Sequence, residues 1–360
     1  MVFHSVCTTF AAMKLKKRRM PAEWEPQSAV QLTWPHEATD WAPILPEITA
    51  VYEEMAREIS KREDLLIVAP EYLLPHLSPL TSKLSPFTSN DTWARDHGFI
   101  TVVEASDLRP QTSDLILLDF CFNGWGEKFE AELDNQINKH LYNQGLLKGI
   151  YEPHLDFVLE GGSIESDGKG TVFTTTCCLM ALHRNQPLTQ QEIEARLKEY
   201  LGAERIVWLN HGSLIGDDTD GHIDTLVRIC PDDTLLYTGG DEDHPDLYEM
   251  EKELQSLRTM EGQPYRLLKL PLPRPIYEEV ISEKGEVISE RLPATYANYL
   301  VVNGAVLVPT YNQPDLDQEA MQVIQQAFPD REIIGIDCRA VIKQHGSLHC
   351  CTMQYYEALR

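Results

Sequence analysis

The feature that most constrains the fold of this chain is the regular alternation of short strand patterns with single helical patterns. The strand patterns are short apolar runs, whereas the helical patterns repeat apolar residues every three or four positions. We predict strands at 21–35, 65–69, 99–103, 115–120, 172–176, 205–209, 226–230, 235–238, 299–302, 305–308 and 332–336, and helices at 46–61, 128–143, 189–201 and 314–328. Such alternation is typical of an α/β fold. The polar stretch 240–290 gives no clear pattern.

Candidate polar residues recur at a nearly constant interval. Asp96 and Glu160 are 64 residues apart, and Glu160 and His222 are 62 residues apart. The interval from His222 to Cys350 is 128 residues, about twice that period. A strand-rich module repeated about five times would produce this spacing if each copy presented one residue to a common centre.

The acidic composition restricts the partners of the chain. With 31 basic and 56 acidic residues, the net charge is −25. Such a surface repels the phosphates of nucleic acids, so we expect no nucleic-acid partner, whereas it suits a cationic small molecule. The apolar runs are too short to cross a membrane, and the eight Cys residues show no zinc-binding spacing. We therefore expect no membrane contact, reduced thiols and a cytoplasmic location.

Residues 1–19 differ in character from the rest of the chain. A weakly apolar stretch precedes basic residues at 14 and 16–19, which is the reverse of the order in a secretory signal. We predict that 1–19 is a disordered leader, an extension that arises from the choice of start codon, with Met20 as an alternative start. Residues 20–360 then form a single domain, since no low-complexity linker divides them.

A Cys directly follows a His near the C-terminus, at His349 and Cys350. A thiol near an imidazole ionises readily, and the thiolate is the nucleophilic form. Adjacent residues of an extended segment point to opposite faces, so only one of Cys350 and Cys351 is expected to enter a shared pocket. A pair of inert buried thiols is the alternative interpretation.

His222 and Asp224 form a second candidate pair, within the acidic run 217–224. If this run is extended, the two side chains share a face, and the carboxylate orients the imidazole for acid–base work. A surface His in an acidic loop is the alternative. A calcium loop with Gly221 at its sixth position would begin at Gly216 and end at Val227, and neither carries a carboxylate. We therefore expect no metal.

Asp96 and Glu160 complete a set suited to a guanidinium. Asp96 precedes a predicted strand, and Glu160 precedes Gly161 and Gly162, where missing side chains would let a ligand approach the backbone. Each could be a turn carboxylate. Taken together with the Cys and the His, however, carboxylates can bind a guanidinium by forked hydrogen bonds while a thiolate attacks its central carbon.

An ordered set of motifs gives residues 20–360 a resemblance to a known family. The motifs are MPAEWEP (20–26), WPH (34–36), NDTWARD (90–96), FNGWGEKF (122–129), EGG (160–162), GDDTDGHID (216–224), NY (298–299), NG (303–304) and GSLHC (346–350). With them the chain resembles the agmatine deiminase branch of the guanidino-modifying, or pentein, superfamily, which is related to Porphyromonas-type peptidyl-arginine deiminases. The resemblance implies a pentein α/β-propeller, with five pseudo-symmetric ββαβ modules around a central polar pocket in one catalytic domain.

The resemblance also implies a reaction and a set of roles. Agmatine would be hydrolysed to N-carbamoylputrescine and ammonia, on the route to putrescine, through a covalent Cys-thiouronium intermediate and without a metal or organic cofactor. The implied roles are nucleophile for Cys350, acid and base for His222, guanidinium clamp for Asp96 and Asp224, support of His222 for Glu160, substrate packing for Trp93 and site lining for Asn298. We also expect Asp217 and Asp218 to attract the far ammonium of agmatine.

Two departures from the family pattern and several alternatives stay open. The family usually has a glycine run and an Asn before the His-Cys pair, where this chain has His345, and a second thiol, Cys351, follows Cys350. A peptidyl-arginine or free-arginine deiminase must also hold a carboxylate or backbone, yet the segment 114–129 contains no Arg and only Lys128 as a basic residue. An amidinotransferase and a non-catalytic ribosome-binding pentein are further alternatives. A homo-oligomer is also left open.

Overall fold

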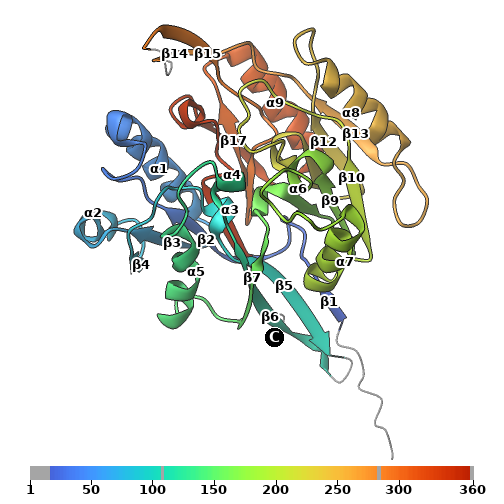
Figure 1. Ribbon diagram of the computed structural model, residues 1–360, viewed down its shortest axis with the longest axis horizontal. Coiled ribbons are helices and arrows are strands. Elements are labelled where there is room, and N and C mark those ends of the chain that lie inside the picture. The colour runs from blue at the N-terminus through green and yellow to red at the C-terminus, as the bar shows by residue number, and fades with distance from the viewer. Residues whose placement is uncertain (1–16, 107–108, 282–284, 357–360) are drawn as a thin grey trace, which may run out of the picture.

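A computed structural model describes residues 17–106, 109–281 and 285–356 (Figure 1). The described strands form six sheets, and five of them contain the same unit. In each unit two antiparallel strands are followed by a helix and by a third strand, which pairs in parallel with the second. The predicted α/β class and the five ββαβ modules are therefore confirmed.

Four of the units follow one another along the chain. The first consists of β5 (Ile100–Ser106), β6 (Arg109–Cys121), α5 (Asp134–Asn143) and β7 (Ile150–Val158). The second consists of β8 (Ile164–Ser166), β9 (Thr171–Thr175), α7 (Gln190–Leu201) and β10 (Arg205–Leu209). The third consists of β11 (Val227–Cys230), β12 (Thr234–Thr238), α8 (Pro245–Ser256) and β13 (Arg266–Leu270), and the fourth of β16 (Leu300–Val302), β17 (Ala305–Thr310), α9 (Pro314–Ala327) and β18 (Glu332–Asp337). The fifth combines β19 (Thr352–Tyr356) with β2 (Gln27–Thr33), α1 (Leu45–Ser60) and β3 (Asp64–Ala69).

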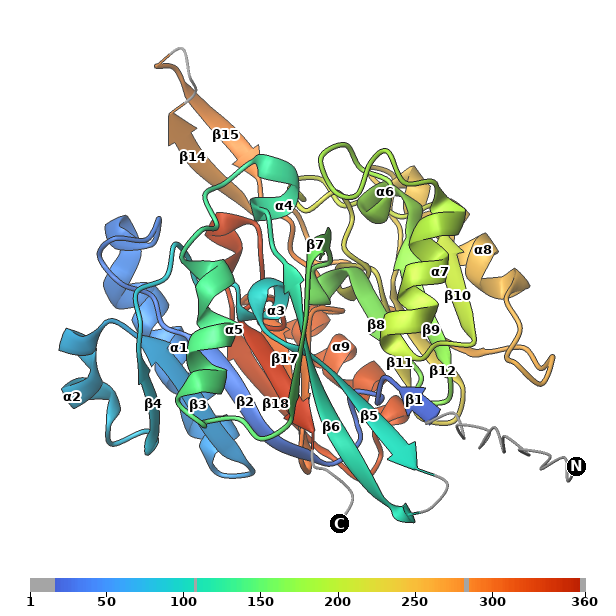
Figure 2. The ribbon, with the colours of Figure 1, turned by 60° about the horizontal axis from the view of Figure 1, so that its bottom comes forward.

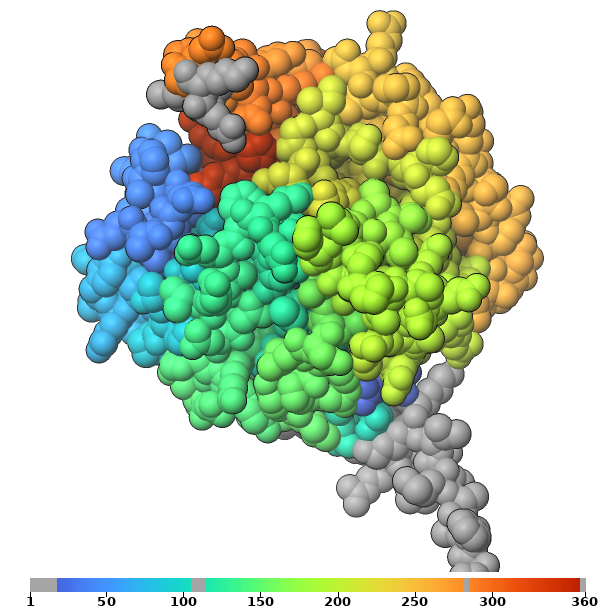
Figure 3. All heavy atoms as spheres, in the orientation of Figure 1, coloured from blue at the N-terminus to red at the C-terminus, as the bar shows by residue number. Residues whose placement is uncertain are grey.

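Two segments that are far apart in the sequence build the fifth unit. β19 pairs antiparallel with β2, so that Thr352 lies opposite Leu32, and a short strand, β4 (Lys83–Pro86), extends the same sheet. Figure 3 shows the chain as successive coloured sectors on one face, from blue through green and yellow to orange. Closure by β19 thus brings a late segment of the described chain beside an early one.

Helix α1 shows how the sequence pattern produces the packing. Its apolar residues at helical spacing, Ile48, Val51, Met55 and Ile59, are all buried, as the periodicity predicts. Helix α7 begins at the predicted capping box, in which the Thr189 side chain accepts from the amide of Glu192. These apolar faces pack against strand residues in two core clusters.

The predicted helix 128–143 begins later than its sequence pattern indicated. Helix α5 begins at Asp134, because the Asn90 side chain accepts from the amide of Leu133 and fixes the start. The residues before it form a tight turn, α4 (Gly124–Glu127), with positive φ at Trp125 and Gly126. This turn aims Trp125 at the site described below.

The predicted leader boundary is wrong at its C-terminal end. Lys17–Arg19 forms β1, which pairs antiparallel with β5, while 1–16 lies outside the described residues. The stretch 240–290 contains α8, β13 and a projecting hairpin of β14 (Tyr277–Ile281) with β15 (Val287–Arg291) (Figure 2). None of the helices in the described ranges is both long enough and apolar enough to cross a membrane.

Candidate active site

The predicted site residues lie directly before the first strands of the units. Asp96 lies in α3 (Ala94–His97) before β5, Glu160 lies before β8, His222 and Asp224 lie before β11, Asn298 lies before β16, and Cys350 lies before β19. These places are equivalent within the repeated unit. The repeat therefore accounts for the interval between the motifs, because each unit delivers one segment to the same region.

Gly162 marks the point on which three of these side chains converge. A methyl group at Gly162 would lie 2.6 Å from His222 Nδ1, 2.9 Å from Asp96 Oδ1 and 3.2 Å from Asp224 Oδ2. A side chain at this position would therefore displace His222 or Asp96. Glycine is therefore required here for room, as the sequence indicated for the Glu160–Gly162 segment.

The prediction that His222 and Asp224 share one face of a strand is wrong. Ile223–Thr225 forms a 3-10 helix before β11 begins, so Asp224 does not lie in a strand. His222 Nδ1 lies 3.7 Å from Asp96 Oδ1. Asp224 instead contacts His349, with 2.7 Å between Oδ2 and Nδ1. The helical turn thus separates the partners of the two residues.

A cavity of about 260 Å³ reaches the candidate nucleophile. Its lining includes Cys350 and Asp96, three aromatic side chains (Trp93, Trp125 and Phe129), three further carboxylates (Asp40, Asp91 and Asp218), and Lys343 and His345. A larger cavity of about 650 Å³ lies against Tyr355 and Tyr356, but its lining contains neither Cys nor His. Reactive groups therefore line the smaller cavity.

Cys350 is buried, and its environment keeps the thiol protonated. Burial and the nearby charges of Asp224 and Asp96 raise the pKa of Cys350 well above its ordinary value. The thiol Sγ lies 3.4 Å from Asn298 Oδ1 and 4.0 Å from Asp224 Oδ2. The expectation that the adjacent His349 ionises this thiol is wrong, because the His349 ring contacts Asp224 and Glu23. A cation placed beside the thiol would lower its pKa.

The two predicted clamp carboxylates have different surroundings. Asp96 accepts from Trp125 Nε1 at 2.9 Å and from the Gly162 amide at 3.0 Å. Burial raises the pKa of Asp96 above its ordinary value. Burial also acts on Asp224, but the hydrogen bond and charge of His349 outweigh it and lower the pKa of Asp224. The two carboxylates are therefore held by different means.

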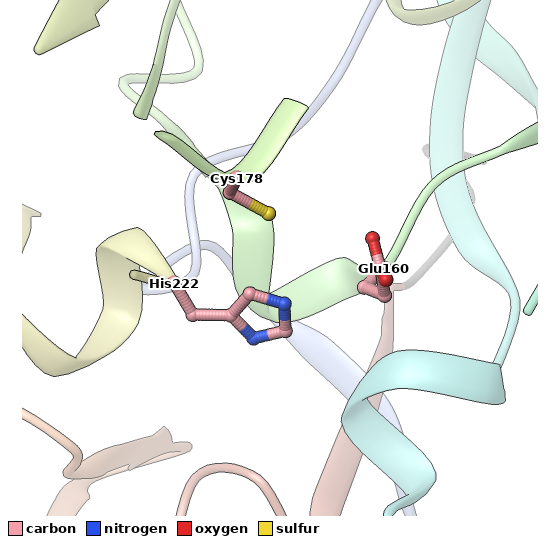
Figure 4. Close-up of side chains that lie close together, drawn as sticks. All are labelled: Glu160, Cys178 and His222. Atoms are coloured by element: carbon pink, nitrogen blue, oxygen red, sulfur yellow. The ribbon is translucent and has the colours of Figure 1, made fainter. Parts of the chain in front are cut away.

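His222 and Glu160 lie together with unpaired polar atoms (Figure 4). Both His222 ring nitrogens and Glu160 Oε2 are buried and have no hydrogen-bond partner within the described part of the chain. Burial disfavours the charged imidazole, but Asp96, Glu160 and Asp224 together raise the pKa of His222. Glu160 Oε1 accepts from Arg184 Nε at 2.8 Å. The ring is thus charged more readily than usual, and its nitrogens are free of hydrogen bonds to the described residues, although neither His222 nor Glu160 is among the residues that line the cavity.

A buried arginine, Arg228, belongs to the site region, although its sequence gave no signal of it. Its guanidinium forms ion pairs with Glu23 and Glu165, and its carbon lies 4.3 Å from the ring centroid of Tyr299. His349 joins this group through Glu23. Sequence reasoning missed Arg228 because contacts between distant segments leave no local pattern. The only sign of this group was that its members Glu23 and His349 each lie inside a family motif.

The remaining predicted substrate residues separate into two kinds. Trp93, Asp96 and Asp218 line the cavity. Asp217, Asp224 and Asn298 are not among its lining residues. The Asp217 carboxylate accepts from the Thr219 hydroxyl at 2.6 Å and from the Gly221 amide at 2.7 Å. Asn298 accepts at Oδ1 from the His349 amide at 2.9 Å. Asp217 thus shapes its loop, and Asp218 faces the ligand space.

The two departures from the family pattern have clear positions. His345 lines the cavity and adopts a left-handed conformation with φ 65°, with Nδ1 2.7 Å from the Gly216 carbonyl. Cys351 lies in the hydrophobic core and not in the cavity lining. The residues are in a turn rather than an extended segment, yet, as predicted, only Cys350 enters the cavity.

Two buried clusters contain side-chain types that bind metals. They are Glu160 with Cys178 and His222, and Glu23 with Glu165 and His349. Each already has an arginine on a carboxylate, Arg184 in the first and Arg228 in the second. Because this positive charge opposes a cation, neither cluster is suited to hold a metal as it stands.

The fold and the site define a pentein-type protein equipped to bind a guanidinium beside a thiol. The profile of the Porphyromonas-type peptidyl-arginine deiminase family matches residues 19–355. The chain belongs to this family.

The relatives of this chain are named for more than one enzyme activity. An agmatine deiminase of Pseudomonas aeruginosa is 33% identical, with 93% of this chain and 95% of the relative covered. The structure of a cysteine-to-serine variant of C. jejuni agmatine deiminase with substrate bound has a TM-score of 0.84 at 35% identity and covers 96% of this chain and 98% of its own. A structure from Porphyromonas gingivalis, named as a candidate arginine deiminase, has a TM-score of 0.85 at 46% identity, covering 96% and 100%.

Proposed function

We propose that this protein is an agmatine deiminase, which hydrolyses agmatine to N-carbamoylputrescine and ammonia. The observation that carries the proposal is a cavity that combines the Cys350 thiol, the Asp96 carboxylate, aromatic walls and a further carboxylate, Asp218. Agmatine has a guanidinium, a tetramethylene chain and a terminal ammonium. Carboxylates suit both cationic ends, and aromatic side chains suit the chain between them.

The first half of the reaction forms a carbon–sulfur bond. The guanidinium lies between Asp96 and Asp224, and its positive charge favours the Cys350 thiolate, whose proton leaves to water. The thiolate attacks the central carbon to give a tetrahedral adduct. His222, in its imidazolium form, donates a proton to the departing amino group, and ammonia leaves. The product of this half is a Cys350 thiouronium.

The second half returns the enzyme to its starting state. His222, now neutral, takes a proton from water, and the hydroxide adds to the thiouronium carbon. Breaking of the carbon–sulfur bond yields the ureido product, and the hydroxyl proton returns to sulfur. Glu160 holds His222 in its charged and neutral forms in turn. The net reaction consumes agmatine and one water and releases N-carbamoylputrescine and ammonia.

Arginine, free or within a peptide, is a second candidate substrate. Lys343 lines the cavity, and its ammonium would attract a carboxylate. However, Lys343 Nζ already lies 2.9 Å from Glu278 Oε1, and no arginine lines the described cavity. Agmatine, which lacks a carboxylate, is therefore the better fit.

Ammonia release and ureido product should be measured together with agmatine, arginine and a peptide ending in arginine. Agmatine should give the highest kcat/KM, Cys350→Ala should abolish turnover, and Cys351→Ala, the matched control, should largely keep it. Faster turnover of an arginine substrate would overturn the substrate assignment. Transfer of the amidino group to an added amine would indicate an amidinotransferase instead, and no turnover with Cys350 unlabelled by 2-chloroacetamidine would indicate a non-catalytic pentein.

We further propose a cytoplasmic location and a place in the synthesis of putrescine. The acidic composition, with a net charge of −25, supports a cationic substrate rather than nucleic acid. Assembly into a homo-oligomer remains a prediction, and light scattering of the purified protein tests it.

A further inference from the structure

His349 lies directly behind the clamp residue Asp224 and is itself only 1% exposed. Its Nδ1 is 2.7 Å from Asp224 Oδ2, and its Nε2 is 2.9 Å from Glu23 Oε2. Ionised carboxylates only accept hydrogen bonds. Both ring nitrogens must therefore carry protons to satisfy both contacts, which makes the ring an imidazolium.

Arg228 allows a second arrangement of protons, in which the His349 ring is neutral and accepts a hydrogen bond. Its Nη2 lies 3.2 Å from His349 Nε2, so a neutral ring could accept there. In that form the Nε2 lone pair would face Glu23 Oε2 at 2.9 Å with no proton between them. Arg228 itself is satisfied elsewhere, by Glu23, by Glu165 and by the carbonyl oxygens of Ala297 and Tyr299. The shorter contact favours the imidazolium.

The charges around His349 also favour the imidazolium. The groups that face it are Asp224 from the 3-10 helix, Glu23 from the segment before β2, Glu165 from β8, Arg228 from β11, and Arg95 from α3, whose Nε contacts the His349 carbonyl. Three carboxylates thus surround two arginines, and Arg95 is directed at the backbone. A positive ring balances the excess negative charge near Asp224.

The consequence for Asp224 is an unequal use of its two oxygens. Oδ2 accepts from His349, whereas Oδ1 is buried without a partner in the described residues. Oδ1 remains available to a guanidinium N–H. The backbone of His349 is fixed as well, since its amide donates to Asn298 Oδ1 at 2.9 Å. One residue therefore positions both the clamp and the segment that carries Cys350.

We propose that His349 is a positioning residue, held as an imidazolium between Asp224 and Glu23, which keeps Asp224 ionised with one oxygen directed at the substrate guanidinium. The proposal rests on the proposed function, because it requires a cationic guanidino substrate. It assigns His349 to substrate binding, whereas proton transfer belongs to His222. Without the ring, buried Asp224 would bind a proton more readily and hold the guanidinium less firmly.

The steady-state test compares His349→Gln with His244→Gln. His244 is a matched control, since it is also buried and pairs with a carboxylate, Asp241, at 2.7 Å, but its ring contacts Asp241 and the Ile215 amide rather than Asp224. His349→Gln should raise the KM for agmatine by about 10- to 100-fold, with kcat changed by only a few fold, and His244→Gln should leave both near wild type. A fall in kcat at unchanged KM, or equal effects of the two variants, would overturn the proposal.

A second measurement separates this proposal from the choice of substrate. Labelling of Cys350 by cationic 2-chloroacetamidine and by neutral iodoacetamide requires no turnover. His349→Gln should slow the cationic reagent more than the neutral one and move its pH dependence upward, because Asp224 must first lose a proton. Equal slowing of both reagents contradicts the proposal, even if the enzyme fails to turn over agmatine.

The charge of the ring can be observed directly in the wild-type protein. Nitrogen-15 NMR of labelled histidine at pH 7 should show both His349 nitrogens protonated, with Glu23→Gln used to assign the signal through its shift. A neutral ring at pH 7 overturns the proposal. This result does not depend on the folding of His349→Gln.

Discussion

Two buried arginines, Arg184 and Arg228, contact carboxylates of the site region, and their surroundings differ in how fully the polar atoms are hydrogen-bonded. Arg184 donates to Glu160 and Asp220 at 2.8 Å each and to the Thr219 carbonyl at 3.0 Å. Arg228 donates to Glu23 and Glu165 and to two carbonyl oxygens. Both therefore neutralise a pair of carboxylates.

The difference lies in the polar atoms that remain. Beside Arg184, Glu160 Oε2 and both His222 nitrogens have no partner in the described chain. Beside Arg228, Glu23 also accepts from the Val301 amide, and Glu165 also accepts from the Ile229 amide. Hydrogen-bonding capacity is thus left open at His222, where we propose proton transfer, and it is filled around Arg228, where charges are held in place.

Replacing His222, which lies among the unpartnered polar atoms beside Arg184, should have the largest effect on activity. His222→Gln keeps the size of the side chain but removes the group that both donates and accepts a proton. We expect kcat to fall by at least about 100-fold, while 2-chloroacetamidine still labels Cys350 because the clamp remains. Near-normal turnover would show that His222 does not carry the proton.

Replacing each arginine in turn tests which of the two contributes more to the stability of the folded protein. Arg228→Met leaves Glu23 and Glu165 buried without their cation, so we expect the free energy of unfolding to fall by about 3–5 kcal/mol. Arg184→Met should cost less, since Asp220 is 34% exposed and can be solvated. Urea unfolding of both variants measures the difference. A larger loss for Arg184→Met would reverse the comparison.

The pH dependence of stability should differ in sign between Asp96 and Asp224. The pKa of Asp224 is lowered in the folded state, so its stabilisation is present above its unfolded pKa of about 3.9 and is lost as the pH falls below it. The pKa of Asp96 is raised, so its contribution is lost as the pH rises above about 3.9 through the folded pKa.

Unfolding free energies of wild type, Asp224→Asn and Asp96→Asn across this range test the signs. The advantage of wild type over Asp224→Asn should shrink in acid. Relative to Asp96→Asn, wild type should lose stability as the pH rises. Parallel profiles for the two variants would mean that their carboxylates are held alike.

Replacing Asp218, a carboxylate that belongs to neither the Arg184 nor the Arg228 group, should have the smallest effect on activity. Asp218 lines the cavity, and burial raises its pKa to about 6. We expect Asp218→Asn to raise the KM for agmatine by about two- to fivefold above that pH and to have no effect below it, where the wild-type carboxyl is already protonated. Butylguanidine, which lacks the ammonium, is the matched control substrate and should show no change.

The sequence predicted the units well because strands and helices depend on local periodicity. Helix α9 was predicted at 314–328 and is observed at Pro314–Ala327, and the turn at Asn303 and Gly304 joins β16 to β17 as predicted. The predicted strand 205–209 matches β10. Where a distant contact decides, prediction failed: the Asn90 side chain sets the start of α5.

The site was predictable in its members but not in their connections. The spacing of the motifs indicated that Asp96, Glu160, His222 and Cys350 meet, and the topology places them at equivalent ends of the units. The pairing of Asp224 with His349 was missed. Arg228 was missed as well, since an arginine inside a strand pattern gives no sign that it is buried among carboxylates from other units.

The pairing of β19 with β2 has a consequence for the synthesis of the protein. β2 leaves the ribosome early, but its antiparallel partner follows only after the four other units have been made. Cys350 lies two residues before this strand, which begins at Thr352. A nascent chain therefore carries the proposed clamp carboxylates before it carries the thiol, and the site is assembled only after all five units have been made.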